Sequence, residues 1–477
     1  MIRPVPARTR RYNQVKVSLV KVGIETDFCL KLVHKLQSKE VVMKAKSFWS
    51  SVGAACLVTL GSVGLSLETA VAGSIFGAPT KGMSVDAYRS LVKLDPQNTV
   101  GVDWDAVRGM SGYFLIDNQG EPTVSVVDYN LGETIKKIDM GEEAGNHHIW
   151  VIPGGRYVWS SQRFESDTFW TIDLLTLEVV DKFSLGSITG VEGIIAPLHV
   201  GFAHTQPLAV VGNILDKEHG YLTFLSTVTR RPLETIEISC HGARDAMFTL
   251  DDSKIFTSCQ QKPKGLSVVD VKSRKEIKMV PVSGGRAGAM SPDGKYFMLA
   301  AKGAILFFDT ETTDLVKTVK VPGGGGNITC LPDGSKCYGG LRKANAVAVI
   351  DMTNLELLKV IETGPNANRL YLNPNNTRYG LFCNESGKSD VVTVIDTQED
   401  VALKNIYTGL GPHNIAFNPE GTRAVVSTKK ETVATLIDTS SADPMDWYVI
   451  TTDLASAIQN NGVRWVLSPE ALKSVLN

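Results

Sequence analysis

The sequence predicts an all-β fold, a β-propeller with eight four-stranded blades. A strand-like apolar run recurs eight times, and seven of the runs end in Asp. The runs follow one another at intervals near 40–45 residues, and a hairpin with a tight turn precedes seven of them. The runs end at Asp128, Asp173, Ser226, Asp270, Asp309, Asp351, Asp396 and Asp438, which are 45, 53, 44, 39, 42, 45 and 42 residues apart. Repeats of this length with several strands in each are typical of propeller blades.

The first 72 residues are expected to be removed from the mature protein. Residues 1–42 carry nine Lys or Arg and three acids and are interpreted as an upstream leader, with translation starting at Met1 or Met43. Residues 43–72 have the pattern of a signal peptide: Lys44 and Lys46, an apolar run from 52 to 67, and small residues before Gly73. The alternatives are an N-terminal domain or a membrane anchor, but the run is short for a bilayer and no second one follows, so no stable membrane span is expected.

The chain that remains is acidic. Residues 73–477 hold 38 Lys or Arg and 46 Asp or Glu, a net charge of about −8 instead of the −1 of the full chain. An acidic surface repels phosphate backbones, so nucleic acid is excluded as an expected partner.

Three segments follow the expected cleavage site. Residues 73–109 are predicted to be an N-terminal arm in which MSVDAYRSLVKL forms a short amphipathic helix, residues 110–470 the propeller, and residues 471–477 a C-terminal tail. In each unit, strands a and b form a hairpin around a turn such as Pro-Asp-Gly, strand c ends in the repeated Asp, and strand d alternates Lys with apolar residues.

The first unit has no recognisable strand a, and NGVRWVLSPEA near the C-terminus is predicted to supply it. Pairing of the two chain ends would close the ring and remove an exposed strand edge. Seven blades are the alternative, if one end unit packs outside the ring. The repeated Asp is predicted to cap the following turn by accepting backbone N–H groups, because a catalytic acid would be needed only once.

The d-to-a and b-to-c connections share one face of such a ring, and the irregular loops and most histidines fall there. His147, His148, His199, His241 and His413 lie at or just before an a strand, and His219 lies in a b-to-c loop. These six are the candidate interaction or channel-mouth residues. Metal or axial haem binding stays open, but adjacent residues on a strand point to opposite faces, so a polar role of the pair His147–His148 is favoured. No catalytic residue is identified.

Five cysteines follow residue 72: Cys240, Cys259, Cys330, Cys337 and Cys383. The odd number leaves at least one thiol unpaired within the chain. Cys330 and Cys337 are predicted to face each other on adjacent strands, where either a disulfide or two buried thiols is possible, and thiols are expected. No CxxCH motif occurs, which excludes covalent c-type haem on this chain.

The xVxVID and PDG repeat resembles the YVTN-type propellers of exported bacterial and archaeal proteins, which extend to haem-binding propellers of dissimilatory nitrite reductases and to amine dehydrogenase heavy chains. The stretches NHHIWVIPGGRYVWSS and CHGARDAMFTLDDSKIFTSCQQ, together with the exported precursor, are similar to the β subunits of hydrazine synthase from anaerobic ammonium-oxidising bacteria.

This second resemblance implies a haem-free, non-catalytic scaffold subunit that has no cofactor of its own. Its partners would be haem-bearing α and γ subunits, which make hydrazine from nitric oxide and ammonium in the anammoxosome lumen. It also implies seven blades, and the eight units counted in this sequence depart from that number. The alternatives are a propeller that holds haem through one of the six histidines, and a periplasmic or surface interaction protein.

Overall fold

The structure is a computed structural model of the whole chain, and it describes residues 92–94, 100–102, 107–142, 145–162, 166–454 and 460–476. The chain divides into two units, residues 1–70 and 71–477. The predicted leader and signal peptide, and residues 83–91 of the predicted helix, lie outside the described residues. The last three residues of that helix, Val92–Leu94, form strand β1, which pairs with β2, Val100–Val102.

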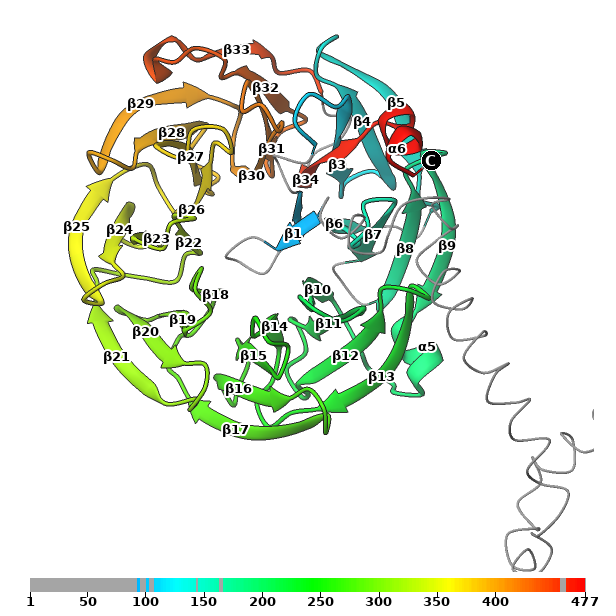
Figure 1. Cartoon of the computed structure of the whole chain (residues 1–477), viewed down its shortest axis with the longest axis vertical. Coiled ribbons are helices and arrows are strands. Elements are labelled where there is room, and N and C mark those ends of the chain that lie inside the picture. Colours follow the sequence, from blue (N-terminus) through cyan, green and yellow to red (C-terminus); the bar gives the residue numbers. More distant parts are fainter. Residues whose placement is uncertain are drawn as a thin grey trace, which may run out of the picture. The chain divides into compact units, whose positions relative to one another are not determined.

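Eight four-stranded antiparallel sheets form a closed ring, as predicted (Figure 1). We number the blades from 1 to 8 and give their strands in the order a, b, c, d. Blade 1 is β34 (Asn460–Leu467), β3 (Gly112–Asn118), β4 (Thr123–Asp128) and β5 (Glu133–Asp139). Blade 2 is β6 (Asn146–Val151), β7 (Tyr157–Gln162), β8 (Thr168–Asp173) and β9 (Glu178–Ser184). Blade 3 is β10 (Pro197–Phe202), β11 (Leu208–Asn213), β12 (Tyr221–Ser226) and β13 (Arg231–Glu237). Blade 4 is β14 (Ala243–Phe248), β15 (Lys254–Cys259), β16 (Gly265–Asp270) and β17 (Lys275–Pro281).

The remaining four blades follow the same order. Blade 5 is β18 (Gly288–Met290), β19 (Tyr296–Ala301), β20 (Ala304–Asp309) and β21 (Leu315–Lys320). Blade 6 is β22 (Ile328–Cys330), β23 (Lys336–Leu341), β24 (Ala346–Asp351) and β25 (Glu356–Glu362). Blade 7 is β26 (Ala367–Leu372), β27 (Tyr379–Asn384), β28 (Val391–Asp396) and β29 (Val401–Tyr407). Blade 8 is β30 (Pro412–Phe417), β31 (Arg423–Thr428), β32 (Ala434–Asp438) and β33 (Tyr448–Thr451).

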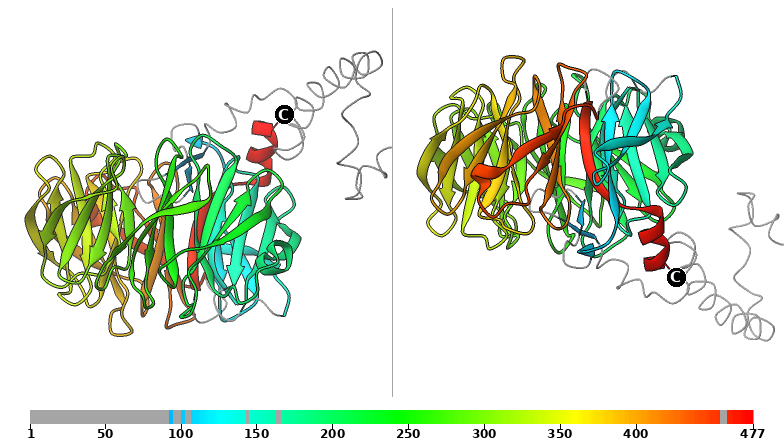
Figure 2. Two further views of the ribbon diagram at one scale, coloured as in Figure 1. Left: turned by 90° about the horizontal axis from the view of Figure 1, so that it is seen from below. Right: turned by 90° about the horizontal axis from the view of Figure 1, so that it is seen from above.

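Few helices accompany the described strands. Helix α5 (Leu185–Thr189) lies between blades 2 and 3, a 3-10 turn η1 (Pro444–Asp446) precedes β33, and α6 (Pro469–Leu476) follows β34. The two side views in Figure 2 show α6 projecting from one face of the ring. No helix among the described residues is long and apolar enough to cross a membrane.

The C-terminal strand β34 closes the ring, as the sequence predicted. It pairs with β3 in antiparallel register, with Phe114 opposite Trp465 and Ile116 opposite Val463. The chain ends therefore complete blade 1 together, and the alternative of seven blades is wrong. Without β34 the edge of β3 would have no partner, and the pairing removes this aggregation hazard of an open array.

The apolar pattern of each strand follows its radial position. Strands b and c lie between neighbouring blades and are buried on both faces, so β11 is buried along its whole length. Strand d is the outer edge and alternates exposed with half-buried residues, as in β5. Aromatic rings fill the space between blades: Trp159 stacks on Phe202 of blade 3, with ring centroids 6.0 Å apart.

The repeated Asp caps the turn after strand c, which confirms its predicted structural role. The Asp128 carboxylate accepts the backbone N–H of Asn130, and Asp309 accepts those of Glu311 and Thr312. Ser226, which replaces Asp in blade 3, accepts the N–H of Thr229 through its hydroxyl. The same contact recurs at Asp173, Asp270, Asp351, Asp396 and Asp438.

Two disulfides form, and the expectation of two thiols at Cys330 and Cys337 is wrong. These residues are direct partners in the β22–β23 pair, with Cα atoms 3.9 Å apart, close enough for a bond across the strands. A second disulfide, which the sequence analysis did not predict, joins Cys240 to Cys259. Cys383 is left as a buried free thiol, in agreement with the odd count. Disulfides are typical of proteins exported to an oxidising compartment.

Candidate ligand pocket at the channel mouth

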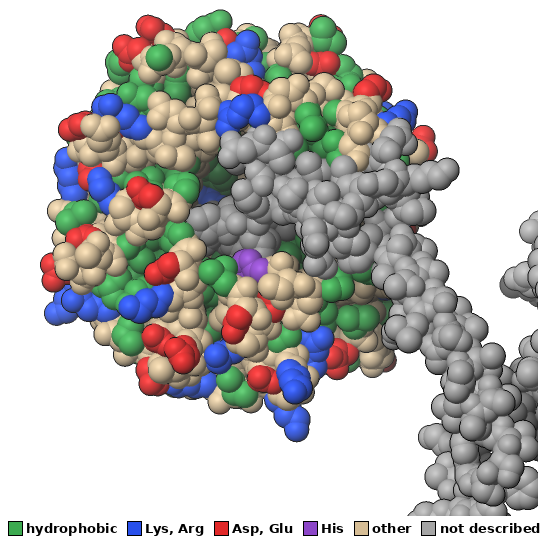
Figure 3. All heavy atoms as spheres, in the orientation of Figure 1, with side chains coloured by type: hydrophobic (Ala, Val, Ile, Leu, Met, Phe, Trp, Pro, Cys, Tyr) green, Lys and Arg blue, Asp and Glu red, His purple; other side chains and the backbone are tan. Residues whose placement is uncertain are grey.

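The a strands line the central channel, and a pocket lies where these strands begin. The pocket has a volume of about 170 Å³. The space free of protein atoms is about 900 Å³ when the open mouth is included. Figure 3 shows the opposite face, which carries α6 and on which the a strands end; charged side chains of both signs are spread over it.

Six blades contribute pocket residues from two adjacent positions of the repeat. His148, Asn327, Arg369, Asn414 and Arg464 lie five residues before the prolines at 153, 332, 374, 419 and 469 that follow their strands. His147, Arg286, Asn368 and His413 lie six residues before such a proline. The repeat thus places these positions of six blades at one level of the channel, and both positions line the pocket in blades 2, 7 and 8.

A β-bulge lets both adjacent positions face the pocket. The register shifts between Asn146 and His148 in β6, between Ala243 and Ala246 in β14, and between Pro412 and Ile415 in β30. A bulge inserts an extra residue and interrupts the alternation of side chains. The expectation that His147 and His148 point to opposite faces is therefore wrong: both line the pocket, and their ring centroids are 4.3 Å apart.

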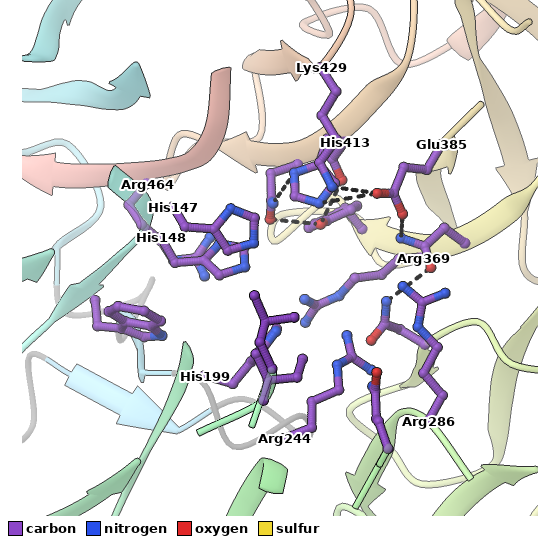
Figure 4. Close-up of a pocket in the computed structure, with 18 residues that line it drawn as sticks. His147, His148, His199, Arg244, Arg286, Arg369, Glu385, His413, Lys429 and Arg464 are labelled. Atoms are coloured by element: carbon purple, nitrogen blue, oxygen red, sulfur yellow. Dashed lines mark hydrogen bonds and ion pairs between the residues drawn. The ribbon is translucent and has the colours of Figure 1, made fainter. Parts of the chain in front are cut away.

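The structure brings four of the six candidate histidines together, namely His147, His148, His199 and His413 (Figure 4). The other two do not line the pocket. His219 stacks on Tyr221, and its Nδ1 lies 3.0 Å from Glu237 Oε1, whereas His241 Nδ1 donates to the carbonyl of Lys217 at 3.0 Å. Among the described residues, no group of three or more His, Cys, Asp and Glu side chains is arranged to hold a metal ion.

His148 is the central imidazole of the group. Its ring centroid lies 4.9 Å from that of His199 and 5.9 Å from that of His413. The pKa of His148 lies well below its usual range, mainly because the side chain is buried. The charges of the neighbouring residues His147, His199, His413 and Arg464 lower this pKa further. Its Nδ1 makes no hydrogen bond within the structure. A neutral imidazole therefore sits in the middle of the pocket, with a buried ring nitrogen that has no hydrogen-bond partner among the described residues.

Gly462 allows the close approach that places Arg464 beside His148. A Cβ at Gly462 would lie 3.2 Å from Cα of His148 and 3.1 Å from the backbone nitrogen of Ile149. Since such contacts are tighter than packing normally allows, any larger residue would push β34 away from β6.

His199 is held on the opposite side of His148 by a strained backbone and a carboxylate. Its φ of 62° lies in the left-handed region, which few residues other than glycine adopt. Its Nδ1 lies 3.4 Å from Asp245 Oδ1. Burial lowers the pKa of His199 to about 3, because the opposing effect of Asp245 is smaller and nearby arginines add to the shift.

Glu385 organises the blade 7 and blade 8 side of the pocket. Its carboxylate accepts from Arg342 at 2.9 Å, Asn368 at 2.8 Å and Lys429 at 2.5 Å, and lies 3.5 Å from His413 Nε2. Burial raises the pKa of this carboxyl, but His413, Lys429 and Arg342 outweigh burial and hold it well below its usual range. Glu385 is thus an anion at neutral pH.

A short relay fixes the orientation of His413. Tyr371 Oη donates to Asn414 Oδ1 at 2.9 Å, and Asn414 Nδ2 donates to His413 Nδ1 at 3.0 Å. Because an amide nitrogen can only donate, His413 accepts at Nδ1, and its neutral form carries the proton at Nε2, toward Glu385.

The pocket is strongly cationic, which the sequence analysis missed. Its lining holds five cations and one carboxylate: Arg244, Arg286, Arg369, Arg464 and Lys429 against Glu385. The signal was present in the repeat, since four of the five cations are arginines of the a strands or their lead-ins, level with the histidines.

Comparisons with known proteins agree with the fold and do not assign a family. No family model matches the chain, and no curated protein matches it. Among solved structures, dihydro-heme d1 dehydrogenase NirN in complex with DHE aligns over 81% of this chain and 77% of its own, with 15% identity and a TM-score of 0.59. Citrobacter koseri AztD aligns over 75% of this chain and 98% of its own, with 13% identity and a TM-score of 0.55.

Kuenenia stuttgartiensis hydrazine synthase aligns over 73% of this chain and 95% of its own, with 16% identity and a TM-score of 0.48. This likeness is too weak to support an assignment to hydrazine synthase. All three similarities concern the propeller fold.

Proposed function

We propose that the pocket binds a haem-type tetrapyrrole that carries carboxylates, without a covalent bond. The observation that carries this proposal is the central, neutral His148 with a free ring nitrogen, surrounded by cations from five blades. A metallo-tetrapyrrole with carboxylates needs these two kinds of partner, an imidazole for the metal and guanidinium or ammonium groups for the acids.

The residues of the pocket fit such a group. Neutral imidazole is the form that ligates a metal, and burial keeps His148 in that form at neutral pH. The charge of the lining favours an anion over a neutral or cationic ligand. The open mouth provides space beyond the enclosed 170 Å³ for a group larger than that volume. The NirN structure, a propeller of similar fold solved with DHE, supports the same class of ligand.

The residues of this chain would have separate tasks. His148 would hold the metal, Trp150 beside it would exclude water, and the arginines would orient the ring through its carboxylates. Glu385 keeps Lys429 and Arg342 in place and would not contact the ligand's acids, because like charges repel. When bound, the tetrapyrrole would supply redox and Lewis-acid chemistry at its metal.

The test is a titration of the metal-free chain 73–477 with ferric protoporphyrin IX, followed by visible absorption. We expect saturable binding that shifts the Soret band, and at least a tenfold weaker affinity in His148→Ala. His241→Ala is the matched control, since His241 lies outside the pocket, and it should bind like the wild type. Equal binding by all three proteins would refute the proposal.

The resemblance to hydrazine synthase supports a second candidate, a haem-free scaffold subunit that shapes access to haems on α and γ partners in the anammoxosome lumen. The observation that favours it is the absence of CxxCH from the whole sequence. An absorption spectrum of the purified chain, with mass spectrometry of the chains that co-purify from the native organism, tests it. A colourless chain accompanied by c-type cytochromes supports this candidate, and a chain that retains haem by itself supports the first.

A further inference from the structure

Three arginines form a separate group within the pocket. Arg244 of blade 4, Arg286 before blade 5 and Arg369 of blade 7 lie on the side away from His147 and His148 (Figure 4). The amides of Asn327 and Asn368 lie beside them and are joined by a hydrogen bond of 3.1 Å.

The described residues compensate the positive charge of this group only in part. Arg286 and Arg369 form no ion pair with them, and Arg369 Nε is buried without a hydrogen bond. Arg369 lies over the ring of Tyr371, 5.0 Å from its centroid. Arg244 is only 6% exposed, and its Nη1 makes no hydrogen bond, although Asp245 Oδ2 lies 3.3 Å away. Asp245 is shared with His199 and with the backbone N–H of Gly288, so it offsets Arg244 only in part.

Crowding of like charges raises the free energy of the ligand-free pocket. Burial, with help from Arg244 and Arg342, lowers the pKa of Arg286 to about 9, which is unusual for a guanidinium. A buried charge without a partner is costly, and a bound anion would remove that cost.

The loops around the mouth reinforce this preference. The b-to-c loops of blades 4 to 8 carry eight cations and three acids, whereas the described parts of these loops in blades 1 to 3 carry one cation and four acids. The exposed cations of the first set are Lys262, Lys264, Lys302, Lys343, Lys388 and Lys430. Such a field steers small anions toward the arginine side of the mouth.

We propose that Arg244, Arg286 and Arg369 form a subsite for a planar oxyanion, of the carboxylate type. A guanidinium can donate hydrogen bonds to both oxygens of a carboxylate at once. Three guanidinium groups and two adjacent amides therefore provide more donors than one carboxylate needs. The oxyanion is either a free small anion or a carboxylate arm of the tetrapyrrole proposed above. The subsite rests on the same pocket but does not require the tetrapyrrole.

The experiment measures formate binding to the haem-free chain 73–477 by isothermal titration calorimetry at constant ionic strength, with chloride as the balancing ion. We expect saturable binding, weakened at least tenfold in Arg286→Gln and Arg369→Gln. Lys272→Gln is the matched control: Lys272 is an exposed cation on the opposite face, in the c-to-d turn of blade 4, and its loss should change nothing. Circular dichroism checks that both arginine variants fold.

Two outcomes overturn the subsite: no saturable heat in the wild type, or the same affinity in all four proteins. Competition separates the two sources of the anion. If the subsite takes a carboxylate arm, formate weakens binding of ferric protoporphyrin IX but not of its dimethyl ester. If it takes a free anion, formate and the porphyrin bind together. If formate binds but the porphyrin does not, only the tetrapyrrole proposal is refuted. If the porphyrin binds but formate does not, only the subsite is refuted.

Discussion

Glu385 and Lys429, which occupy the same loop position in blades 7 and 8, form an ion pair of 2.5 Å at the channel mouth. Arg342 occupies this position in blade 6 and binds the other oxygen of the same carboxylate at 2.9 Å. One acid therefore ties three neighbouring blades together at the level of the pocket, and it is the single carboxylate of the described lining.

Replacement of Glu385 by Gln should destabilise the chain by about 3 kcal/mol, because it removes the buried carboxylate that two half-buried cations share. The difference from the wild type should be present at neutral pH and should shrink in acid: the pKa of Glu385 is depressed in the folded state, so its stabilising effect is lost as the pH falls through that low value. Urea denaturation at several pH values measures this.

Glu356→Gln is the control for that variant. Glu356 is exposed and lies 4.0 Å from Lys317, a surface pair worth at most about 1 kcal/mol. If both substitutions cost the same, Glu385 does not have the organising role described.

Arg286→Met should raise the melting temperature and weaken anion binding in the same protein. The charged guanidinium is disfavoured in the folded pocket, and its removal should stabilise the ligand-free chain by roughly 1–2 kcal/mol. Because the folded pKa is about 9 and the unfolded one lies well above it, the cost is full below pH 9 and is relieved as the pH rises through that value. Thermal melts at pH 7 and pH 10 should show a smaller gap at pH 10. A lower melting temperature for the variant at pH 7 would contradict this account.

The thiol count tests both disulfides. The chain 73–477, denatured without a reductant, should react with one equivalent of a thiol reagent, from Cys383, and with five equivalents after reduction. Cys383→Ser should reduce the first value to zero. Three equivalents before reduction would mean that one bridge is absent.

Ring closure can be tested by truncation. A chain that stops at Leu454 lacks β34, so β3 loses its partner and Phe114 and Ile116 lose their cover. We expect aggregation in size-exclusion chromatography. A chain that stops at Ser468 keeps β34 and loses only α6, and should remain monodisperse with a lower melting temperature. Equal behaviour of the two would argue against closure by the C-terminal strand.

The fold could be predicted because its signals are local and repeated. Turn residues and the terminal Asp of strand c recur in sequence, and each has a direct structural cause, as the contacts of Asp309 show. The bulge at His148 could not be predicted, because it depends on the register between two strands and not on the residues of one. The disulfides could not be predicted either, because their pairing depends on the distances between cysteines on different strands.

The site could be predicted in part. The position of strand a gave the mouth of the channel, which is where His147, His148, His199 and His413 lie. His219 and His241 share the same face but are held by Glu237 and by the Lys217 carbonyl. The cations were overlooked because each belongs to a different unit, and the common level of Arg286, Arg369 and Arg464 appears only when the units are aligned on the turn proline.

The most direct test of the central claim is crystallographic. A crystal of the chain 73–477 grown with ferric protoporphyrin IX would be measured at the iron absorption edge, and the anomalous map would locate the metal. We predict one iron peak within bonding distance of the His148 imidazole at the channel mouth. A peak at His219, at His241 or elsewhere outside the pocket, or no peak in crystals that contain the porphyrin in solution, would contradict the account.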